Sequence, residues 1–339
     1  MKFELLQNHP MITGNHKIGW GNPTDYRDDE LLESICDYFD KRTKIEPISY
    51  ENSVWFNNVE RQKPIIDLLQ RRDLDALHDL FRNMFSSPLT HGTAQGDVQT
   101  QQFRNDPSFT ARVVQGGYDR LVSLMEMFEI IPLFSPEEYS FNNRFDYYFT
   151  ISADEYIKKL MDKFNVDLTA PKYSGNLLGM DTSYGIYNER DIIAIGIALL
   201  IHEKFPDKSM RICEIGGGTG HLAYYLYKLG YENITIVDLP TISLSQMYFL
   251  SVNLGKDKVK LLAPQEFTGD YDIVVNVDSM TEMNIESATE YCDKMMNKAL
   301  FISINHEANS FTVADVCKMQ RVSRNLFWLR RGYIIEEFI

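Results

Sequence analysis

The chain has 339 residues, and 44% of them are hydrophobic, so it can bury a sizeable core in one large domain or two smaller ones. Its formal net charge of −14 disfavours a nucleic-acid substrate, because binding phosphates requires clustered lysine and arginine side chains. The first ten residues lack the pattern of a signal peptide, and the longest strongly apolar run, 192–201, is too short to span a bilayer. We therefore expect a soluble, cytoplasmic protein without a membrane span.

Helical periodicity dominates the first half of the chain, where irregular stretches that contain glycine and asparagine separate the helices. The predicted helices span residues 28–40, 61–84, 111–128, 153–164 and 189–204. The irregular stretches span residues 85–108, 133–150 and 167–187. We expect residues 1–185 to form a mainly helical cap that recognises an acceptor, and residues 186–339 to form a second domain. The boundary is not sharp, because the helix 189–204 is expected to pack on the second domain.

Strands and helices alternate in the second half of the chain. The predicted strands span residues 211–215, 233–237, 258–262, 272–277 and 299–304. The helices between them span residues 221–229, 242–253 and 285–297. This alternation predicts an α/β fold in which a parallel sheet carries helices on both faces. Beyond it, we expect a helix over 312–325 and a closing hairpin with strands 326–330 and 333–339.

A glycine-rich turn follows the first of these strands and precedes a predicted helix. The segment reads Glu214-Ile-Gly-Gly-Gly-Thr-Gly220, so its glycines are Gly216, Gly217, Gly218 and Gly220. Glycine lets the backbone turn sharply and approach a ligand, and the following helix offers free N–H groups to a polar ligand group. A dinucleotide fingerprint, G-x-G-x-x-G, would need a glycine at the position of His221. The pattern acid-x-G-x-G-x-G instead resembles motif I of the class I S-adenosylmethionine (SAM) methyltransferases.

A second acidic residue follows the next predicted strand. Asp238 comes 18 positions after Gly220 and directly before Leu239, another candidate cofactor residue. A carboxylate at this strand end can accept hydrogen bonds from both ribose hydroxyls of a nucleoside. An ordinary turn with an acid beside it is the alternative explanation. Glu214, the glycines and Asp238 at this spacing together favour SAM binding.

Ligands of open α/β sheets bind beyond the carboxyl ends of the strands, so the residues that follow each strand are candidates for the site. Gln265 follows the third strand, where it can hydrogen-bond the adenine amino group. Tyr184 and Arg190 precede the first strand, in a segment that we expect to pass over the cofactor. Arg190 is a candidate partner of the methionine carboxylate, and Tyr184 is a candidate stacking surface. A polar loop and the start of an amphipathic helix explain these three residues equally well.

Three residues after the fourth and fifth strands are candidates for catalysis. Methyl transfer to oxygen needs a base, because the acceptor hydroxyl loses its proton as the new bond forms. Asp278 and Glu282 can act as that base or hold a divalent metal, while a helix cap and a solvated acid are the alternatives. His306 follows the fifth strand, where a histidine can take a proton near neutral pH. His91, in an irregular loop, is better explained as a surface residue.

Several segments together resemble a family of bacterial sugar O-methyltransferases within class I. These segments are Glu214–Gly220, Val237–Pro240, Asn276–Met283, Ser303–Asn305 and Trp328–Tyr333. The resemblance covers the chain well from about residue 175 onward and only thinly upstream. It implies a Rossmann-like seven-stranded sheet whose last strand is antiparallel, with SAM as cofactor and S-adenosylhomocysteine (SAH) as product. It also implies that the acceptor is a sugar hydroxyl, nucleotide-linked or in a glycan, of a polysaccharide or natural-product pathway.

Two other functions stay open on the sequence alone. The acceptor can be a non-sugar hydroxyl, such as that of a phenol or a polyketide, or the chain can be a non-catalytic SAM-binding scaffold. Acids and a histidine that are expected to face the cleft argue against the scaffold. Neither dependence on a divalent metal nor the oligomeric state, a homodimer included, follows from the sequence.

Overall fold

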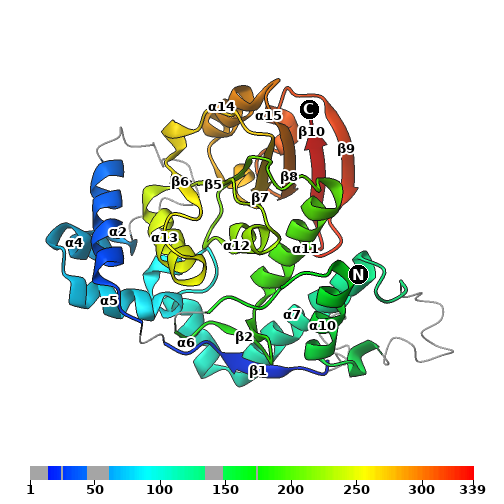
Figure 1. The fold of residues 1–339 in the computed structure, drawn as a ribbon, viewed down its shortest axis with the longest axis horizontal. Coiled ribbons are helices and arrows are strands. Elements are labelled where there is room, and N and C mark those ends of the chain that lie inside the picture. Colours follow the sequence, from blue (N-terminus) through cyan, green and yellow to red (C-terminus); the bar gives the residue numbers. More distant parts are fainter. Residues whose placement is uncertain (1–13, 24–25, 44–60, 134–147, 173–174) are drawn as a thin grey trace.

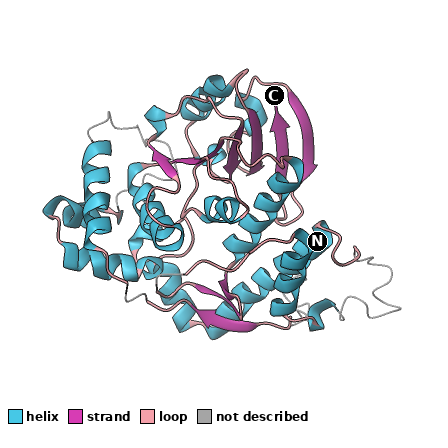
Figure 2. Ribbon diagram, viewed as in Figure 1, coloured by secondary structure: helices cyan, strands magenta, loops and turns pink. Residues whose placement is uncertain are grey.

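The computed structural model describes residues 14–23, 26–43, 61–133, 148–172 and 175–339 (Figure 1). Within these ranges the chain forms one sheet of seven strands and one of three, and helices lie around and between them (Figure 2). No helix in these ranges is both long and apolar enough to cross a bilayer. The predicted irregular stretch 133–150 falls largely outside the described residues.

The larger sheet is built from the C-terminal half of the chain. Its strands are β4 (Ile212–Ile215), β5 (Ile234–Val237), β6 (Lys260–Leu262), β7 (Ile273–Val277), β8 (Leu300–His306), β9 (Arg321–Leu326) and β10 (Tyr333–Phe338). They lie in the order β6-β5-β4-β7-β8-β10-β9. The first five of these pair in parallel, whereas β10 is antiparallel to both of its neighbours. The predicted fold class, a Rossmann-like α/β sheet of seven strands whose last strand is antiparallel, is therefore confirmed.

The central strands are buried on both faces, which explains their nearly continuous apolar sequences. Every residue of β4 and β5 is buried. The helices between the parallel strands are α12 (His221–Lys228), α13 (Pro240–Leu254) and α14 (Ile285–Met295). They lie close to their predicted positions, and each returns the chain so that the next strand can be parallel.

The direction of the strand order reverses at β4. β5 and β6 lie on one side of β4, whereas β7 and β8 lie on the other side. Loops that leave neighbouring strands at such a switch point diverge, and a crevice forms between them. The glycine loop after β4, Asp238 after β5 and Asp278 after β7 therefore come together at one edge of the sheet.

The segment before the last strand differs from its prediction. The sequence predicts a helix over 312–325, but only α15 (Val313–Val316) is helical there, and β9 begins at Arg321. The predicted strand 326–330 is wrong, because most of it lies in the turn between β9 and β10. β9 is an exposed edge strand, so it lacks the alternating apolar pattern of a half-buried strand, and main-chain pairing with β10 stabilises it.

The N-terminal region is mainly helical but also contains the small sheet. Its α-helices are α2 (Asp29–Arg42), α4 (Lys63–Arg71), α5 (Leu74–Arg82), α6 (Asp97–Asn105), α7 (Pro107–Met127) and α10 (Ala153–Phe164), and η1 (Met84–Ser86) and η2 (Pro88–Thr90) are 3₁₀-helices. The small antiparallel sheet consists of β1 (Lys17–Trp20), β2 (Leu178–Thr182) and β3 (Gly185–Tyr187). Neither this sheet nor α6 was expected from the sequence, which predicts irregular stretches at 85–108 and 167–187.

One predicted helix, 61–84, is in fact two helices. Arg72 adopts a left-handed conformation with φ of 51° and ends α4. Asp73 then caps α5, because its side chain accepts a hydrogen bond from Ala76 N. The apolar spacing continues on both sides of this break, so periodicity alone does not reveal it.

Among the described residues, the larger of two apolar core clusters joins the two halves of the chain. α11 (Glu189–Lys204), which matches its prediction, packs on α7 from the N-terminal region and on α12 from the sheet. α2 packs on α13 in the same way, and Figure 1 shows α2, α4 and α5 grouped on that side of the molecule. Buried side chains from Leu31 to Tyr333 belong to one contact cluster. The N-terminal helices are thus packed directly against the helical layer of the larger sheet.

Candidate active site

A cavity of about 210 Å³ opens at the switch point of the larger sheet. Asp278 and Ser279 after β7 line it, as do Gly92 and Thr93 of the N-terminal region. The predicted cofactor residues that line it are Glu214, Gly216, Gly217, Gly218, Asp238, Leu239 and Arg190. Most of the residues that were predicted from strand ends, but not Gln265 or His306, are therefore brought to one cavity.

Three glycines of the loop, Gly216, Gly218 and Gly220, have a left-handed backbone, which residues with side chains rarely adopt. Gly216 has φ of 71°, and a Cβ on it would lie 2.0 Å from Ser279 Oγ. Gly218 has φ of 57°, but a Cβ on it would meet Thr93 at an ordinary distance of 3.7 Å. Gly216 is thus required by both conformation and space, whereas Gly218 is required by conformation alone.

A set of buried amide side chains fixes the loop that follows β7. Asn276 Nδ2 donates hydrogen bonds to Ile215 O at 2.9 Å and to Ser279 Oγ at 2.6 Å. Asn305 Nδ2 in turn donates to Asn276 Oδ1 at 2.8 Å. These bonds connect the carboxyl ends of β4, β7 and β8, so they hold Ser279 against Gly216. Buried polar groups that are satisfied in this way specify one arrangement of the surrounding chain.

Asp238 is held by three N–H donors. Its Oδ2 accepts hydrogen bonds from Gly218 N at 3.2 Å and from Gln246 Nε2 at 2.7 Å, and its Oδ1 accepts one from Leu239 N at 2.8 Å. Burial raises the pKa of this carboxyl to about 7, although the three donors oppose the shift. A carboxylate offers about four acceptor positions, so Oδ1 retains the capacity to accept one more hydrogen bond.

Glu214 is the second carboxyl of the cavity wall. Its Oε2 is buried and has no hydrogen-bond partner in the part of the chain that the structure describes. Burial, assisted by the charge of the neighbouring Asp238, raises the pKa of Glu214 to about 8. Two buried carboxyls thus face the same small cavity, and one of them has an unsatisfied oxygen atom.

These raised pKa values predict that the stability of the protein falls as pH rises. In the folded chain Glu214 and Asp238 keep their protons up to about pH 8 and 7, whereas in the unfolded chain they lose them near pH 4. Between these limits the folded state binds more protons, so the free energy of unfolding decreases by up to about 1.4 kcal/mol per pH unit for each group. Thermal unfolding from pH 5 to pH 8.5 should show this slope in the wild type and a shallower slope in Glu214→Gln.

The control for this experiment is Glu232→Gln, which removes an exposed carboxyl on the other side of α12 from the cavity loop. It should keep the slope of the wild type. An unchanged slope in Glu214→Gln would contradict the assignment of the titrating groups.

A cationic group lies at the start of α11. Asn188 caps this helix, because its Oδ1 accepts hydrogen bonds from Arg190 N at 2.7 Å and from Asp191 N at 3.1 Å. Arg190 lines the cavity together with His221. Burial and the charge of Arg190 lower the pKa of His221 to about 3. His221 is therefore neutral, and Arg190 brings positive charge to this part of the wall.

Asp278 is held in a fixed orientation at the end of β7, where its φ is 61°. Its Oδ2 accepts a hydrogen bond from Arg330 Nη1 at 2.6 Å, and its Oδ1 accepts one from Tyr333 OH at 2.6 Å. Burial and the bond to Asp278 raise the pKa of the Tyr333 hydroxyl, which therefore remains a donor. The carboxylate retains acceptor capacity on both oxygens, so a ligand hydroxyl in the cavity can donate to it.

The other two predicted catalytic residues differ in their positions. His306 Nε2 lies 3.7 Å from Asp278 Oδ1, and its Nδ1 accepts a hydrogen bond from Ala308 N at 3.2 Å. This arrangement assigns the proton of the neutral ring to Nε2, on the side of Asp278. His306 does not line the cavity, whereas Glu282 of η4 (Met280–Glu282) does. Over the described ranges, no three His, Cys, Asp or Glu side chains converge in a metal-binding arrangement.

Three predicted cofactor residues are not part of the cavity wall. Gln265 belongs to η3 (Pro264–Glu266), and Pro264 lines the cavity in its place. Tyr184 lies in the turn between β2 and β3. Gly220 has φ of 98° and precedes the first residue of α12, so its role is to begin that helix.

Sequence reasoning missed the side chains that hold these acids in place. Gln246 is fully buried on α13, eight positions after Asp238, but Ser243 and Ser245 of the same helix are buried as well, so the sequence does not single Gln246 out. Arg330 and Tyr333 lie within a segment that carries the family resemblance, but nothing in their spacing connects them with Asp278. Thr93 lies in a stretch that the sequence predicts to be irregular.

No family model and no curated protein matches the chain. Several solved structures are similar to it, among them a magnesium protoporphyrin IX methyltransferase of Synechocystis PCC 6803 with bound SAM. It is 14% identical over 44% of this chain and 79% of that one, with a TM-score of 0.36. A glycopeptide N-methyltransferase in complex with sinefungin is 13% identical over 43% of this chain and 93% of the other, with a TM-score of 0.35. A mitomycin 7-O-methyltransferase is 9% identical over 44% and 56%, with a TM-score of 0.33.

Proposed function

We propose that the protein is a SAM-dependent methyltransferase whose cofactor binds in the cavity at the switch point. The observation that carries this proposal is the pair of buried acids, Glu214 and Asp238, beside the glycine loop. Asp238 Oδ1 retains capacity for a ribose hydroxyl, and the unsatisfied Oε2 of Glu214 calls for a hydrogen-bond partner from a ligand. A nucleoside with a cationic amino acid attached offers ribose hydroxyls and further polar groups for these positions.

The remaining wall suits the other parts of SAM. Arg190 would pair with the methionine carboxylate, and Leu239 and Pro264 would pack against the adenine. The cofactor supplies an activated methyl group on a sulfonium centre. The protein then has to orient the acceptor and remove its proton.

The reaction that we propose is O-methylation, with Asp278 as the base. Its carboxylate lines the cavity, and Arg330 and Tyr333 hold it in one orientation. An acceptor hydroxyl that donates to Asp278 would transfer its proton there as the carbon–oxygen bond forms. His306 would act through Asp278, because its Nε2 proton lies on the side of that carboxylate.

We infer that the acceptor is a sugar hydroxyl and that residues 1–185 select it. The resemblance to sugar O-methyltransferases supports this inference, and so do the polar residues that share the cavity wall with Asp278. These are Glu282, Asn284 and Ser287. A sugar presents several hydroxyls, so acids, amides and hydroxyls in the wall suit it better than an apolar pocket does.

One observation favours a different acceptor. Ile193, Ala194 and Ile197 of α11 form an apolar stretch of the same wall. An apolar wall suits a phenol or a polyketide hydroxyl. The two candidates are separated by incubating the protein with SAM and sugar nucleotides or phenols, and by mass spectrometry for the added methyl group. Methylation of phenols alone would contradict the sugar assignment.

Cofactor binding is the first property to measure. Titration calorimetry should show binding of SAM and SAH and no binding of NAD. Above pH 7, where Asp238 is ionised, Asp238→Ala should weaken SAM binding by about 1.5–3 kcal/mol, because it removes a charged acceptor of the ribose hydroxyls. Asp207→Ala removes an exposed carboxylate that accepts hydrogen bonds from Ser209 N and Oγ and does not line the cavity, so it should leave the affinity unchanged. Unchanged affinity in Asp238→Ala would rule out the ribose assignment.

A further inference from the structure

The cavity has a wall that the alternating half of the chain does not supply. Gly92 and Thr93, from the segment between α5 and α6, line it. Thr219 Oγ1 donates a hydrogen bond to Thr93 Oγ1 at 3.3 Å, and a Cβ on Gly218 would lie 3.7 Å from Thr93 Cβ. The N-terminal region therefore touches the glycine loop directly.

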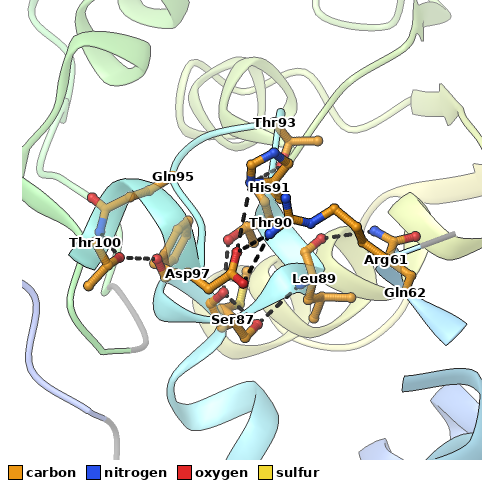
Figure 3. A network of polar contacts seen from close by, with 12 residues as sticks. Arg61, Gln62, Ser87, Leu89, Thr90, His91, Thr93, Gln95, Asp97 and Thr100 are labelled. Carbon is orange, nitrogen blue, oxygen red and sulfur yellow. Dashed lines mark hydrogen bonds and ion pairs between the residues drawn. The ribbon is translucent and has the colours of Figure 1, made fainter. Parts of the chain in front are cut away.

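Buried hydrogen bonds give this segment a definite shape (Figure 3). Thr90 Oγ1 donates to Met84 O at 2.8 Å, and Thr93 Oγ1 donates to Thr90 O at 3.1 Å. Leu89 N donates to Ser87 Oγ at 3.2 Å. Ser87, Thr90 and Thr93 are all buried. Breaking such bonds would leave buried polar groups unsatisfied, so the segment keeps its shape in the absence of a ligand.

A second group of contacts ties the segment to α6. Gln95 Nε2 donates to Thr100 Oγ1 at 2.6 Å, and Arg61 pairs with Asp97 at 3.2 Å (Figure 3). His91 Nδ1 lies 3.8 Å from Asp97 Oδ1. Burial, together with the charge of Arg61, lowers the pKa of His91. His91 is therefore neutral and forms no ion pair with Asp97, so Arg61 is the cation that pairs with this carboxylate.

Two glycines let the segment fold back on itself. Gly92 has φ of 84°, in the left-handed region. A Cβ on Gly96 would lie 2.9 Å from His91 Cα, so the chain can return over His91 only because this position is glycine. The return brings Thr93 against Thr219.

We propose that Thr93 is a positioning residue of the cofactor site. Through its hydrogen bond to Thr219 it fixes the glycine loop in the conformation that binds SAM, and with Gly92 it closes the cavity on that side. Glycine-rich turns lose much conformational freedom on binding a ligand, so a contact that fixes the turn beforehand increases affinity. This inference rests on the proposed function, and it gives the N-terminal region a part in binding the cofactor.

The test is titration calorimetry of full-length variants with SAH. Thr93→Val removes the hydroxyl and keeps the shape of the side chain, and we expect the Kd for SAH to rise about tenfold, as for the loss of one hydrogen bond. Thr93→Ser keeps the hydroxyl and should bind within about twofold of the wild type. Thr219→Val removes the bond between the two threonines but keeps the bond from Thr93 to Thr90 O, so it should weaken binding by no more than Thr93→Val does. The double valine variant should add little to Thr93→Val, because that variant has already lost the bond between the threonines.

Thr110→Val is the matched control. Thr110 is as buried as Thr93, and its Oγ1 donates to Phe103 O at 2.6 Å, but it does not line the cavity. This variant should lower Tm without changing the Kd for SAH. Equal weakening in Thr110→Val and Thr93→Val would show a general loss of stability and would overturn the proposal.

A wild-type affinity of Thr93→Val for SAH would also overturn the proposal that Thr93 positions the cofactor site. If Thr93→Val does not fold, the affinity of Thr219→Val decides the question in the same way. Failure of the wild-type protein to bind SAM or SAH would instead refute the proposed function, so the two proposals can fail separately.

Discussion

Replacing Asp278 with asparagine should lower kcat on the true acceptor by about 10²–10⁴-fold while SAM affinity is retained. Asparagine keeps the size of the side chain but cannot take the proton of the acceptor hydroxyl. The effect is expected to be large because the carboxylate lines the cavity and two donors, Arg330 and Tyr333, hold it at 2.6 Å. Quantitative mass spectrometry of the methylated product measures turnover, and calorimetry with SAH measures cofactor binding.

A control for this variant lies at the other end of the same strand. Asp272, directly before β7, accepts hydrogen bonds from Arg211 N at 2.7 Å and from Arg211 Nη2 at 3.0 Å. Asp272→Asn therefore loses a comparable arginine partner far from the cavity and should keep its turnover. His306→Ala should have a smaller effect than Asp278→Asn, because His306 does not line the cavity. Near-wild-type turnover in both Asp278→Asn and His306→Ala would assign proton removal to the N-terminal region, a bound metal or solvent.

Gly216→Ala should weaken SAH binding by about 100-fold or more and should also destabilise the protein. The added Cβ would lie 2.0 Å from Ser279 Oγ, and the left-handed backbone, with φ of 71°, adds strain. The glycine loop can accept alanine here only by moving away from β7 and thus out of its binding conformation. Calorimetry with SAH and thermal unfolding measure the two effects.

Two further variants separate the clash at Gly216 from the backbone strain. Gly230 has φ of 91°, and the atom nearest to an added Cβ is Lys208 Cγ at 3.9 Å. Gly230→Ala should therefore lose about 1 kcal/mol of stability from strain alone and bind SAH normally. Combining Gly216→Ala with Ser279→Gly removes the atoms in conflict and should restore part of the affinity. No gain of affinity in this double variant would contradict the packing explanation.

The strands of the larger sheet and the helices that connect them could be predicted, because the apolar pattern of each element is visible in its own residues. β4 and β5 are short apolar runs buried on both faces, and they end directly at the glycine loop and Asp238. α6 could not be found in this way, because Thr100 is its only buried residue and the helix shows no apolar stripe. β1 pairs with β2 through partners such as Lys17 and Asp181, which are far apart in the chain. No local sequence pattern therefore predicts β1.

The same contrast holds for the site. Asp238 and Asp278 could be placed in it because each follows a predicted strand, and Glu214 because it lies at the end of one; the carboxyl ends of parallel strands meet at one edge. The residues that hold them come from elsewhere: Arg330 is 52 positions from Asp278, and Thr93 is 126 positions from Thr219. Gln265 lay outside the cavity although it follows a strand, because the short η3 helix turns the chain there. Strand ends predict which backbone reaches a site, but not which distant side chains complete it.

The packing of α11 bears on how the acceptor preference of such a protein could be engineered. Most of its residues from Asp191 to Ile201 are buried, and an added Cβ on Gly196 would meet both Leu124 of α7 and Leu329 of the last hairpin. Removing the N-terminal region would expose this helix to water, and grafting a foreign region would have to reproduce its surface atom for atom. Point substitutions around the cavity mouth, made within the existing scaffold, are therefore the workable route to a new acceptor. Because the two halves share this packing, we expect them to unfold together and not as exchangeable modules.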